Sequence, residues 1–267
     1  MRYINKKYLN VESFKQKYVS NDPFPHIVFD NFIEKDIIEN IHLEFPNLQD
    51  LEGHIKFHNQ KELKFASVGS HHLSPSAKQL LGYLNSDVFL RHLQSLTSIK
   101  ETLISDPYFE GGGYHEIKRQ GFLEVHADFN KHFFINLDRR VNLLLYLNKS
   151  WESKWGGALE LYNKNNLKTP AKEIDPIFNR CVIFNTTSES YHGHPKPLIC
   201  PRDTSRKSIA LYYYSVGRPV KERKNSHSTI FRPALEKKTT TYLNKTKNFL
   251  KLFIPPIILK LKNKIAF

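Results

Sequence analysis

The stretch GFLEVHAD at residues 121–128 decides which fold is expected for this chain. From Phe122 onward its side chains fit a short strand. Successive side chains of a strand point to opposite faces, so His126 and Asp128, two positions apart, point the same way. An imidazole and a carboxylate on one face can share a metal ion. Residues 122–128 therefore predict a strand that carries two possible ligands.

The pattern of apolar and polar residues changes near residue 111, upstream of this strand. Beyond it, short apolar runs with a period of two are separated by turn residues, which is typical of strands. The clearest runs are residues 141–147, 158–162, 181–185 and 209–215. Strands joined by turns, without intervening helices, argue against a βαβ fold and favour a jelly roll or barrel.

The N-terminal third has a different pattern. Residues 24–32 predict a short strand, and residues 34–45 a helix that stops before Pro46. Residues 47–75 are polar and predict a loop, whereas leucines recurring over residues 77–96 predict a second helix. The expected fold is α+β or mainly β: a double-stranded β-helix (jelly roll, cupin-like) with N-terminal supporting helices.

Composition sets the domain organisation and the expected compartment. The 267 residues are 40% hydrophobic, enough for one large domain, which we place at residues 1–235. The only cysteines are Cys181 and Cys200, and the N-terminus lacks the apolar run of a signal peptide, so we expect a reducing, cytoplasmic location.

Positive charge gathers at the C-terminus. The formal net charge is +14, and residues 236–267 hold eight lysines and one glutamate, which is half of the excess. Lysines alternate there with bulky apolar side chains, but Pro255 and Pro256 interrupt runs too short for the roughly 20 residues of a membrane span. We expect a basic, apolar tail that either packs on the domain or a partner, or lies on an anionic membrane surface.

A third ligand would complete a known type of iron site. Two histidines and one carboxylate form a facial arrangement that leaves positions open for oxygen and a co-substrate. The best candidate is His192 in the segment SYHGH, residues 190–194, and His194 competes with it. Downstream, Arg206 opens the strand at 209–215 and can present a planar fork to a carboxylate.

Taken together, these features resemble the 2-oxoglutarate/Fe(II) dioxygenases of the prolyl-4-hydroxylase-like branch. The resemblance covers roughly residues 24–217. Its motifs come in the family's order: His126-x-Asp128, then RVNLLLYLN at 140–148, GGAL at 156–159, NRCVIF at 179–184, His192, and Arg206-x-Ser208.

The resemblance implies a role for each matched residue. His126, Asp128 and His192 would bind Fe(II), and Arg206 would bind the distal carboxylate of 2-oxoglutarate. Further co-substrate contacts would come from Tyr146, with Asn142 on the same strand face, and from the apolar wall of Leu159. Four more residues are candidates for substrate or supporting contacts: Tyr114, His115, His194 and Ser208. Many relatives use an upstream tyrosine near the co-substrate, and either Tyr114 or His115 could take that place.

The implied activity is hydroxylation of an unactivated C–H bond, coupled to decarboxylation of 2-oxoglutarate to succinate. Fe(II), 2-oxoglutarate and O₂ would be required, with ascorbate as reductant. A prolyl residue of a protein is the first choice of substrate, and a small molecule, sugar or lipid is the alternative, because fold does not fix function. A different class of function would be a non-catalytic basic module that binds membrane or nucleic acid, but no nucleic-acid-binding pattern is present.

Overall fold

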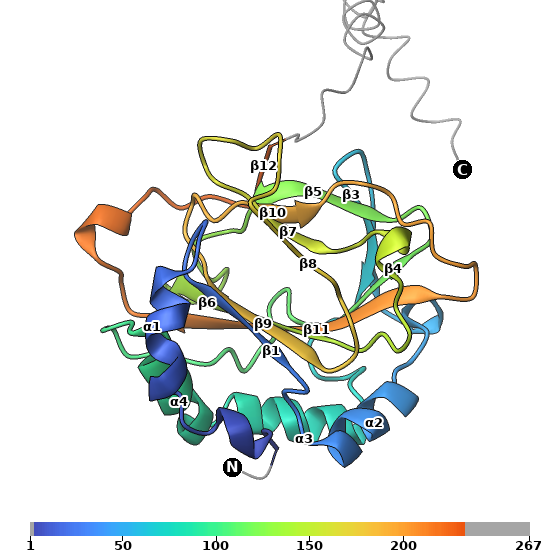
Figure 1. Cartoon of the computed structure of the whole chain (residues 1–267), viewed down its shortest axis with the longest axis horizontal. Coiled ribbons are helices and arrows are strands. Elements are labelled where there is room, and N and C mark those ends of the chain that lie inside the picture. Colours follow the sequence, from blue (N-terminus) through green and yellow to red (C-terminus); the bar gives the residue numbers. More distant parts are fainter. Residues whose placement is uncertain (1–2, 233–267) are drawn as a thin grey trace, which may run out of the picture. The chain divides into compact units, whose positions relative to one another are not determined.

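The computed structural model describes residues 3–232 and contains one continuous, curled, antiparallel sheet. Its strands follow the order β1-β9-β6-β11-β4-β3-β5-β10-β7-β8, with β2 paired to β3 and β12 paired to β5. The sheet folds back on itself, so that two layers face each other (Figure 1). The expected double-stranded β-helix is thereby confirmed. The expected tail at residues 236–267 lies outside the described residues.

The first layer contains the longest strands. It is built from β1 (His26–Asp30), β9 (Arg180–Asn185), β6 (Asp138–Tyr146), β11 (Ser205–Ser215) and β4 (Gly113–Lys118). The helices cover the outer face of this layer (Figure 1). Leucines of the helices, such as Leu80 and Leu93, form one buried cluster with Leu143 and Tyr213 of the strands.

The second layer carries both histidines of the expected ligand set. It contains β5 (Phe122–Ala127), β10 (His192–His194), β7 (Leu159–Leu161) and β8 (Lys172–Ile174). The hairpin of β2 (Ile55–His58) and β3 (Glu62–Ala66) joins it to β4, and β12 (Ile230–Phe231) adds to β5. The expected strands at 24–32, 122–128, 141–147, 158–162, 181–185 and 209–215 correspond to β1, β5, β6, β7, β9 and β11.

Four α-helices support the first layer: α1 (Glu12–Ser20), α2 (Lys35–Leu43), α3 (Pro75–Leu84) and α4 (Asp87–Thr97). Short 3-10 helices occur at Lys6–Tyr8, Leu48–Asp50, Ser153–Trp155 and Val220–Glu222. Along the described residues 3–232 none of the helices has the length and apolar character needed to cross a membrane.

Two sequence expectations about the N-terminal third were wrong. The single helix expected over 77–96 is two helices, because the hydroxyl of Ser86 accepts a hydrogen bond from the Phe89 amide and starts a new helix. The segment expected to be a loop, 47–75, contains the β2–β3 hairpin. Strand β2 has the sequence IKFH, which does alternate apolar and polar residues, but it is short and mostly exposed, and the polar character of the surrounding segment hid this signal.

Candidate active site

Strands β5 and β10 of the second layer bring His126, Asp128 and His192 together. His126 of β5 lies directly opposite His192 of β10, and Asp128 follows the end of β5. One ligand atom from each residue lies within 4.8 Å of the other two. The Nε2 atoms of His126 and His192 are 3.6 and 3.5 Å from the Asp128 carboxylate oxygens. This is a compact cluster of two imidazoles and one carboxylate.

Both imidazoles are oriented by main-chain carbonyls. The Nδ1 atom of His126 is 2.9 Å from the oxygen of Glu124, and that of His192 is 2.9 Å from the oxygen of Ser190. A carbonyl only accepts hydrogen bonds, so Nδ1 must carry the proton in each ring. This tautomer leaves both Nε2 lone pairs available for a cation. Burial, followed by the His126 charge, lowers the pKa of His192 to about 4, so this imidazole is neutral near pH 7.

The carboxylate is held on one oxygen only. Oδ2 of Asp128 accepts a hydrogen bond from Asn142 Nδ2 at 2.8 Å and lies 3.1 Å from Nη2 of Arg139. Burial alone would raise the pKa of Asp128, but the Arg139 charge, followed by the interactions with His192 and His126, outweighs burial and holds that pKa well below its usual value. Asp128 is therefore an anion, with Oδ1 left for a metal.

This donor set fits a divalent iron ion. Two neutral imidazoles and a single carboxylate are the ligands of the facial iron sites, and all three face one another here. The roles of His126, Asp128 and His192 as ligands stay a prediction, which their convergence supports. Sequence reasoning left His194 as a rival to His192. The register pairs His194 with Leu123 and keeps it out of the cluster.

Behind the cluster lies a small cavity of about 80 Å³. Arg206 lines it and is 5% exposed. Its Nε donates to the oxygen of Gly157 at 2.7 Å, and its Nη2 donates to the hydroxyl of Tyr146 at 3.2 Å. A buried guanidinium fixed in this way is suited to bind a carboxylate that enters the cavity. Other expected residues also line it: Asn142, Leu159, His194, Ser208 and His115.

Gly157 is required where it lies beside Arg206. Its φ of +77° is in the left-handed region, and a Cβ there would lie 2.6 Å from Leu198 Cδ2 and 3.1 Å from Arg206 Cδ. The expected glycine pair therefore gives the arginine room to lie against the main chain.

His194 is the least satisfied polar group in the small cavity. It is 2% exposed, and neither ring nitrogen has a hydrogen-bond partner in the described part of the chain. Burial, and then the charge of Arg206, lowers its pKa well below the ordinary value, so the ring is neutral. A neutral imidazole here can donate one hydrogen bond to a bound molecule and accept another.

The structure separates the two upstream candidates. Tyr114 is fully buried beside Phe45 and interacts with the hydroxyl of Ser74, so it belongs to the core. His115, on the opposite face of β4, lines both the small cavity and the larger one in front of it. Of the two, His115 is the one placed to contact a co-substrate.

Sequence reasoning missed Arg139. Its guanidinium is buried between the rings of Phe129 and Tyr212, with its Cζ atom 4.3 and 3.4 Å from their centroids. It also donates from Nε and Nη2 to Oδ1 of Asn142, at 3.0 and 2.8 Å. The available signal in the sequence was the pair Arg139-Arg140, which directly precedes the expected strand at residues 141–147. Arginines that such a strand buries need partners.

A β-bulge explains why Arg139 and Asn142 face the same way despite their odd spacing. In β6 the register shifts between Val141, opposite Tyr213, and Arg139, opposite Tyr214. Arg140 is the extra residue, and a bulge of this kind turns the following side chains to the other face. Simple alternation would have placed Arg139 on the wrong side.

A larger cavity of about 530 Å³ opens in front of the cluster. Its floor includes His126, Asp128 and Arg139, and its walls are largely apolar, with aromatic side chains from several segments. Cavities of this size and character are typical of substrate sites.

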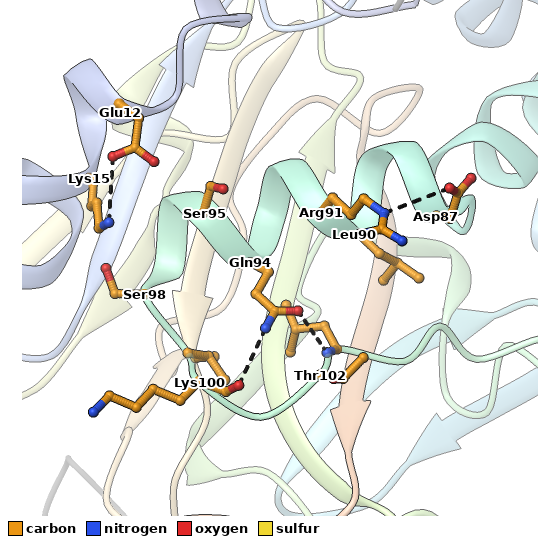
Figure 2. A pocket seen from close by; sticks show the side chains of 12 residues that line it. Glu12, Lys15, Asp87, Leu90, Arg91, Gln94, Ser95, Ser98, Lys100 and Thr102 are labelled. Atoms are coloured by element: carbon orange, nitrogen blue, oxygen red, sulfur yellow. Dashed lines mark hydrogen bonds and ion pairs between the residues drawn. The ribbon is translucent and has the colours of Figure 1, made fainter.

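A third cavity, of about 760 Å³, lies along the exposed face of α4 (Figure 2). Four of its charged side chains form pairs, Lys15 with Glu12 and Arg91 with Asp87, and Gln94 bonds to the neighbouring main chain. It contains none of the expected site residues.

The part of the chain that contains this site is similar to known proteins. Residues 112–214, which include the cluster and Arg206, match the family described as the 2OG-Fe(II) oxygenase superfamily. A curated relative is the mouse (Mus musculus) prolyl 3-hydroxylase OGFOD1, 26% identical over 209 residues, which are 74% of this chain and 34% of the relative. The chain thus spans about a third of the length of that relative.

Solved structures share the fold. A prolyl hydroxylase from Trichoplax adhaerens, solved in complex with a peptide fragment of the hypoxia inducible factor oxygen degradation domain, has a TM-score of 0.57 at 18% identity, covering 79% of this chain and 91% of that one. A prolyl-4-hydroxylase from Pseudomonas putida has a TM-score of 0.54 at 15% identity, covering 78% and 100%.

Proposed function

We propose, from the premise that this chain belongs through residues 112–214 to the 2OG-Fe(II) oxygenase superfamily, that it hydroxylates a prolyl residue of a protein. The observation that carries the proposal is the meeting of His126, Asp128 and His192 in front of a small cavity that contains Arg206. The named activities of the mouse relative and of the two solved structures support the choice of a prolyl substrate.

Each residue of the site would have its own role in the proposed reaction. When bound, Fe(II) supplies the oxidation by O₂, which places one oxygen atom on the substrate carbon and the other in succinate, with release of CO₂. Arg206 would pair with the distal carboxylate of 2-oxoglutarate through its planar fork, beside the hydroxyl of Tyr146. Leu159 and Leu144 would keep water from the co-substrate, and His194 and His115 would supply polar contacts.

Two accompanying conditions belong to the proposal. Ascorbate would keep the iron in its divalent state between turnovers. Cys181 and Cys200 are both buried free thiols, which is compatible with a reducing compartment such as the cytoplasm.

The proposal is tested by incubating the full chain with Fe(II), ascorbate, 2-oxoglutarate and a cell extract. We expect succinate to form and mass spectrometry to find proline residues that have gained one oxygen. His126→Ala and Arg206→Ala should abolish both products, the first through the metal and the second through the co-substrate. Arg202→Ala, at an exposed arginine four positions before Arg206, should leave them unchanged.

Calorimetry separates this proposal from a non-catalytic binding module on the same fold. The wild-type chain with Mn(II) should bind 2-oxoglutarate, and Arg206→Ala should weaken this binding strongly. Absence of 2-oxoglutarate binding in the presence of Mn(II) would favour the module.

A further inference from the structure

We infer that the larger cavity binds the residues on either side of the hydroxylated proline, and that its substrate is an extended polypeptide segment with large apolar side chains at these positions. The inference rests on the proposed function and names the class of sequence that the site would select. It follows from four properties of this cavity: its volume, its exposed apolar rim, the hydrogen bonds that hold this rim, and its charge.

The volume of the larger cavity requires more than one substrate residue to enter it. The cavity of about 530 Å³ has His126 and Asp128 in its lining, so the reacting C–H bond would lie at its floor. A single pyrrolidine ring is far too small to fill it. The residues next to the target must therefore occupy the remaining space, and their side chains must match its walls.

The rim of the cavity is formed by exposed apolar side chains. Five of the thirteen large hydrophobic residues that are exposed within residues 3–232 line this one cavity. They are Ile55, Val68, Tyr108, Phe133 and Phe134, with exposures of 41%, 45%, 60%, 59% and 74%. Contiguous exposed apolar groups mark interaction sites, whereas isolated ones are normal on any surface. A substrate with apolar side chains would remove these groups from water.

The rim aromatics are held in place by a buried hydrogen bond between His132 and Asp106. His132 is 6% exposed, and its Nδ1 accepts hydrogen bonds from the amides of Phe134 and Ile135, at 3.1 and 3.3 Å. Nε2 must then carry the proton, and it lies 3.3 Å from Oδ1 of Asp106. Asp106 in turn accepts from the amides of Tyr108 and Glu110, at 2.9 and 2.7 Å.

This arrangement ties two separate loops together. One loop presents Tyr108 and the other presents Phe133 and Phe134, and the rings of Tyr108 and Phe134 are 6.3 Å apart. Phe133 is further supported by the ring of Phe129, at 4.8 Å. The exposed aromatic rings are therefore fixed features of the site, which reduces the entropy lost when a substrate binds.

Charge does not favour an anionic substrate. The chain carries a net charge of +14, yet the cavity lining contains the acidic residues Glu62, Glu110 and Asp128 against Lys64 and Arg139. Glu62 and Lys64 form an ion pair at 3.0 Å. An acidic or phosphorylated flank would gain little here, so the apolar lining is left as the main source of selectivity.

A peptide library tests this inference. The full chain, with Fe(II), ascorbate and 2-oxoglutarate, is incubated with synthetic peptides that hold one central proline and randomised residues on both sides. Hydroxylated members are then sequenced by mass spectrometry. We expect enrichment of Leu, Ile, Val, Phe and Met beside the proline by about fivefold or more, as burial of apolar side chains would give.

Two double variants with matched chemistry make the result specific to this cavity. Phe133→Ser with Phe134→Ser should abolish the enrichment and raise the Kd of a labelled, enriched peptide for the Mn(II) and 2-oxoglutarate form by about fivefold or more. Val216→Ser with Val220→Ser, at valines 74% and 76% exposed that do not line the cavity, should change neither measurement.

The outcomes separate this inference from the function it rests on. Hydroxylation without apolar enrichment, or equal enrichment in the Phe133 and Phe134 variant, would overturn the inference and leave the prolyl hydroxylase proposal intact. Hydroxylation of no library member by a chain that does hydroxylate proteins of the cell extract would overturn the inference alone, and hydroxylation in neither would overturn both. Enrichment of acidic flanks would overturn the inference in favour of an anionic substrate.

Discussion

At the residue scale, the geometry of Asp128 depends on two neighbours that do not face solvent. Arg139 and Asn142 both hold Oδ2, and they are bound to each other, so the carboxylate cannot rotate without breaking several hydrogen bonds. Partners of this kind typically contribute 10- to 100-fold to the metal affinity of a site. Arg139 is thus a positioning residue for the predicted ligand.

We predict that Arg139→Leu weakens Mn(II) binding by about 10- to 100-fold, because Asp128 loses one of its two partners. Titration calorimetry of the full chain measures this directly. Arg139→Lys should restore only part of the affinity, since an ammonium lacks the rigid planar fork that holds Asp128 and Asn142 together. Unchanged affinity in Arg139→Leu would show that Asn142 alone suffices. Arg202→Leu, at the surface, provides the control.

A second prediction at this scale concerns Tyr146. Its hydroxyl accepts from Arg206 at 3.2 Å, so Tyr146→Phe leaves a buried guanidinium with one partner fewer. Losing a hydrogen bond to a charged group costs about 1.5–3 kcal/mol, and we expect the KM for 2-oxoglutarate to rise by about tenfold or more. Mn(II) affinity should stay the same, because Tyr146 does not contact the cluster. A parallel loss of Mn(II) binding would contradict this role.

At the element scale, β5 and β10 show what could be predicted and what could not. Alternation along β5 gave the common face of His126 and Asp128, because it depends only on local backbone geometry. The choice of His192 over His194 depends on register, and register is a relation between strands that one strand's sequence does not specify. The resemblance to the family's motifs favoured His192, and this is the histidine that lies in the cluster with His126 and Asp128.

The β-bulge in β6 was the main obstacle to predicting which side chains share a face of the strand. The period of two placed Tyr146 and Asn142 correctly on the inner face of β6, but it fails at Arg140, where the bulge begins. Asn142 was therefore expected to contact the co-substrate, and the structure shows that it also supports Asp128. The β2–β3 hairpin escaped prediction for a different reason, since its two alternating runs are short and lie within a polar segment.

Helix α4 offers a test of local structure that is separate from activity. Its N-cap Ser86 accepts from Phe89, and its C-cap Ser98 has a φ of +58°, a conformation that favours glycine. We predict that Ser86→Ala lowers the free energy of unfolding by about 1 kcal/mol. Ser98→Gly should raise it, by about 0.5–1 kcal/mol.

Urea denaturation measures both changes in the wild-type background. Because Ser86→Ala removes a cap and Ser98→Gly relieves an unfavourable backbone conformation, effects of the same sign would contradict the capping account. Neither substitution should alter 2-oxoglutarate binding, since α4 covers the outer face of the first layer.

At the scale of the whole molecule, the site depends on the closure of the sheet. His126 and His192 are 66 positions apart in the sequence, and Arg206 lies on β11, in the opposite layer. The order of motifs indicated this convergence because it matched a known family, while composition and periodicity alone indicated only a mainly β fold. The aromatic rim was not foreseen, since its loops follow no periodic pattern.

We predict that the ligands stabilise the whole domain. Mn(II) and 2-oxoglutarate bind the folded state only, and a ligand at about 100 times its Kd adds about 2.7 kcal/mol. For a domain of this size this corresponds to a rise in Tm of about 5–10 °C. His126→Ala should show no rise with Mn(II), as measured by differential scanning fluorimetry. An equal rise in His126→Ala would place the bound metal elsewhere.

The two cavities at the site are nested, and this sets an order of events. They share lining residues, among them Lys64 and Tyr212, with Arg206 in the inner cavity and the aromatic rim around the outer one. A polypeptide seated in the outer cavity would stand in the path of anything entering the inner one. Steady-state kinetics should therefore be sequential and ordered: the keto acid associates first, the polypeptide second, and the hydroxylated chain departs before the dicarboxylate behind it.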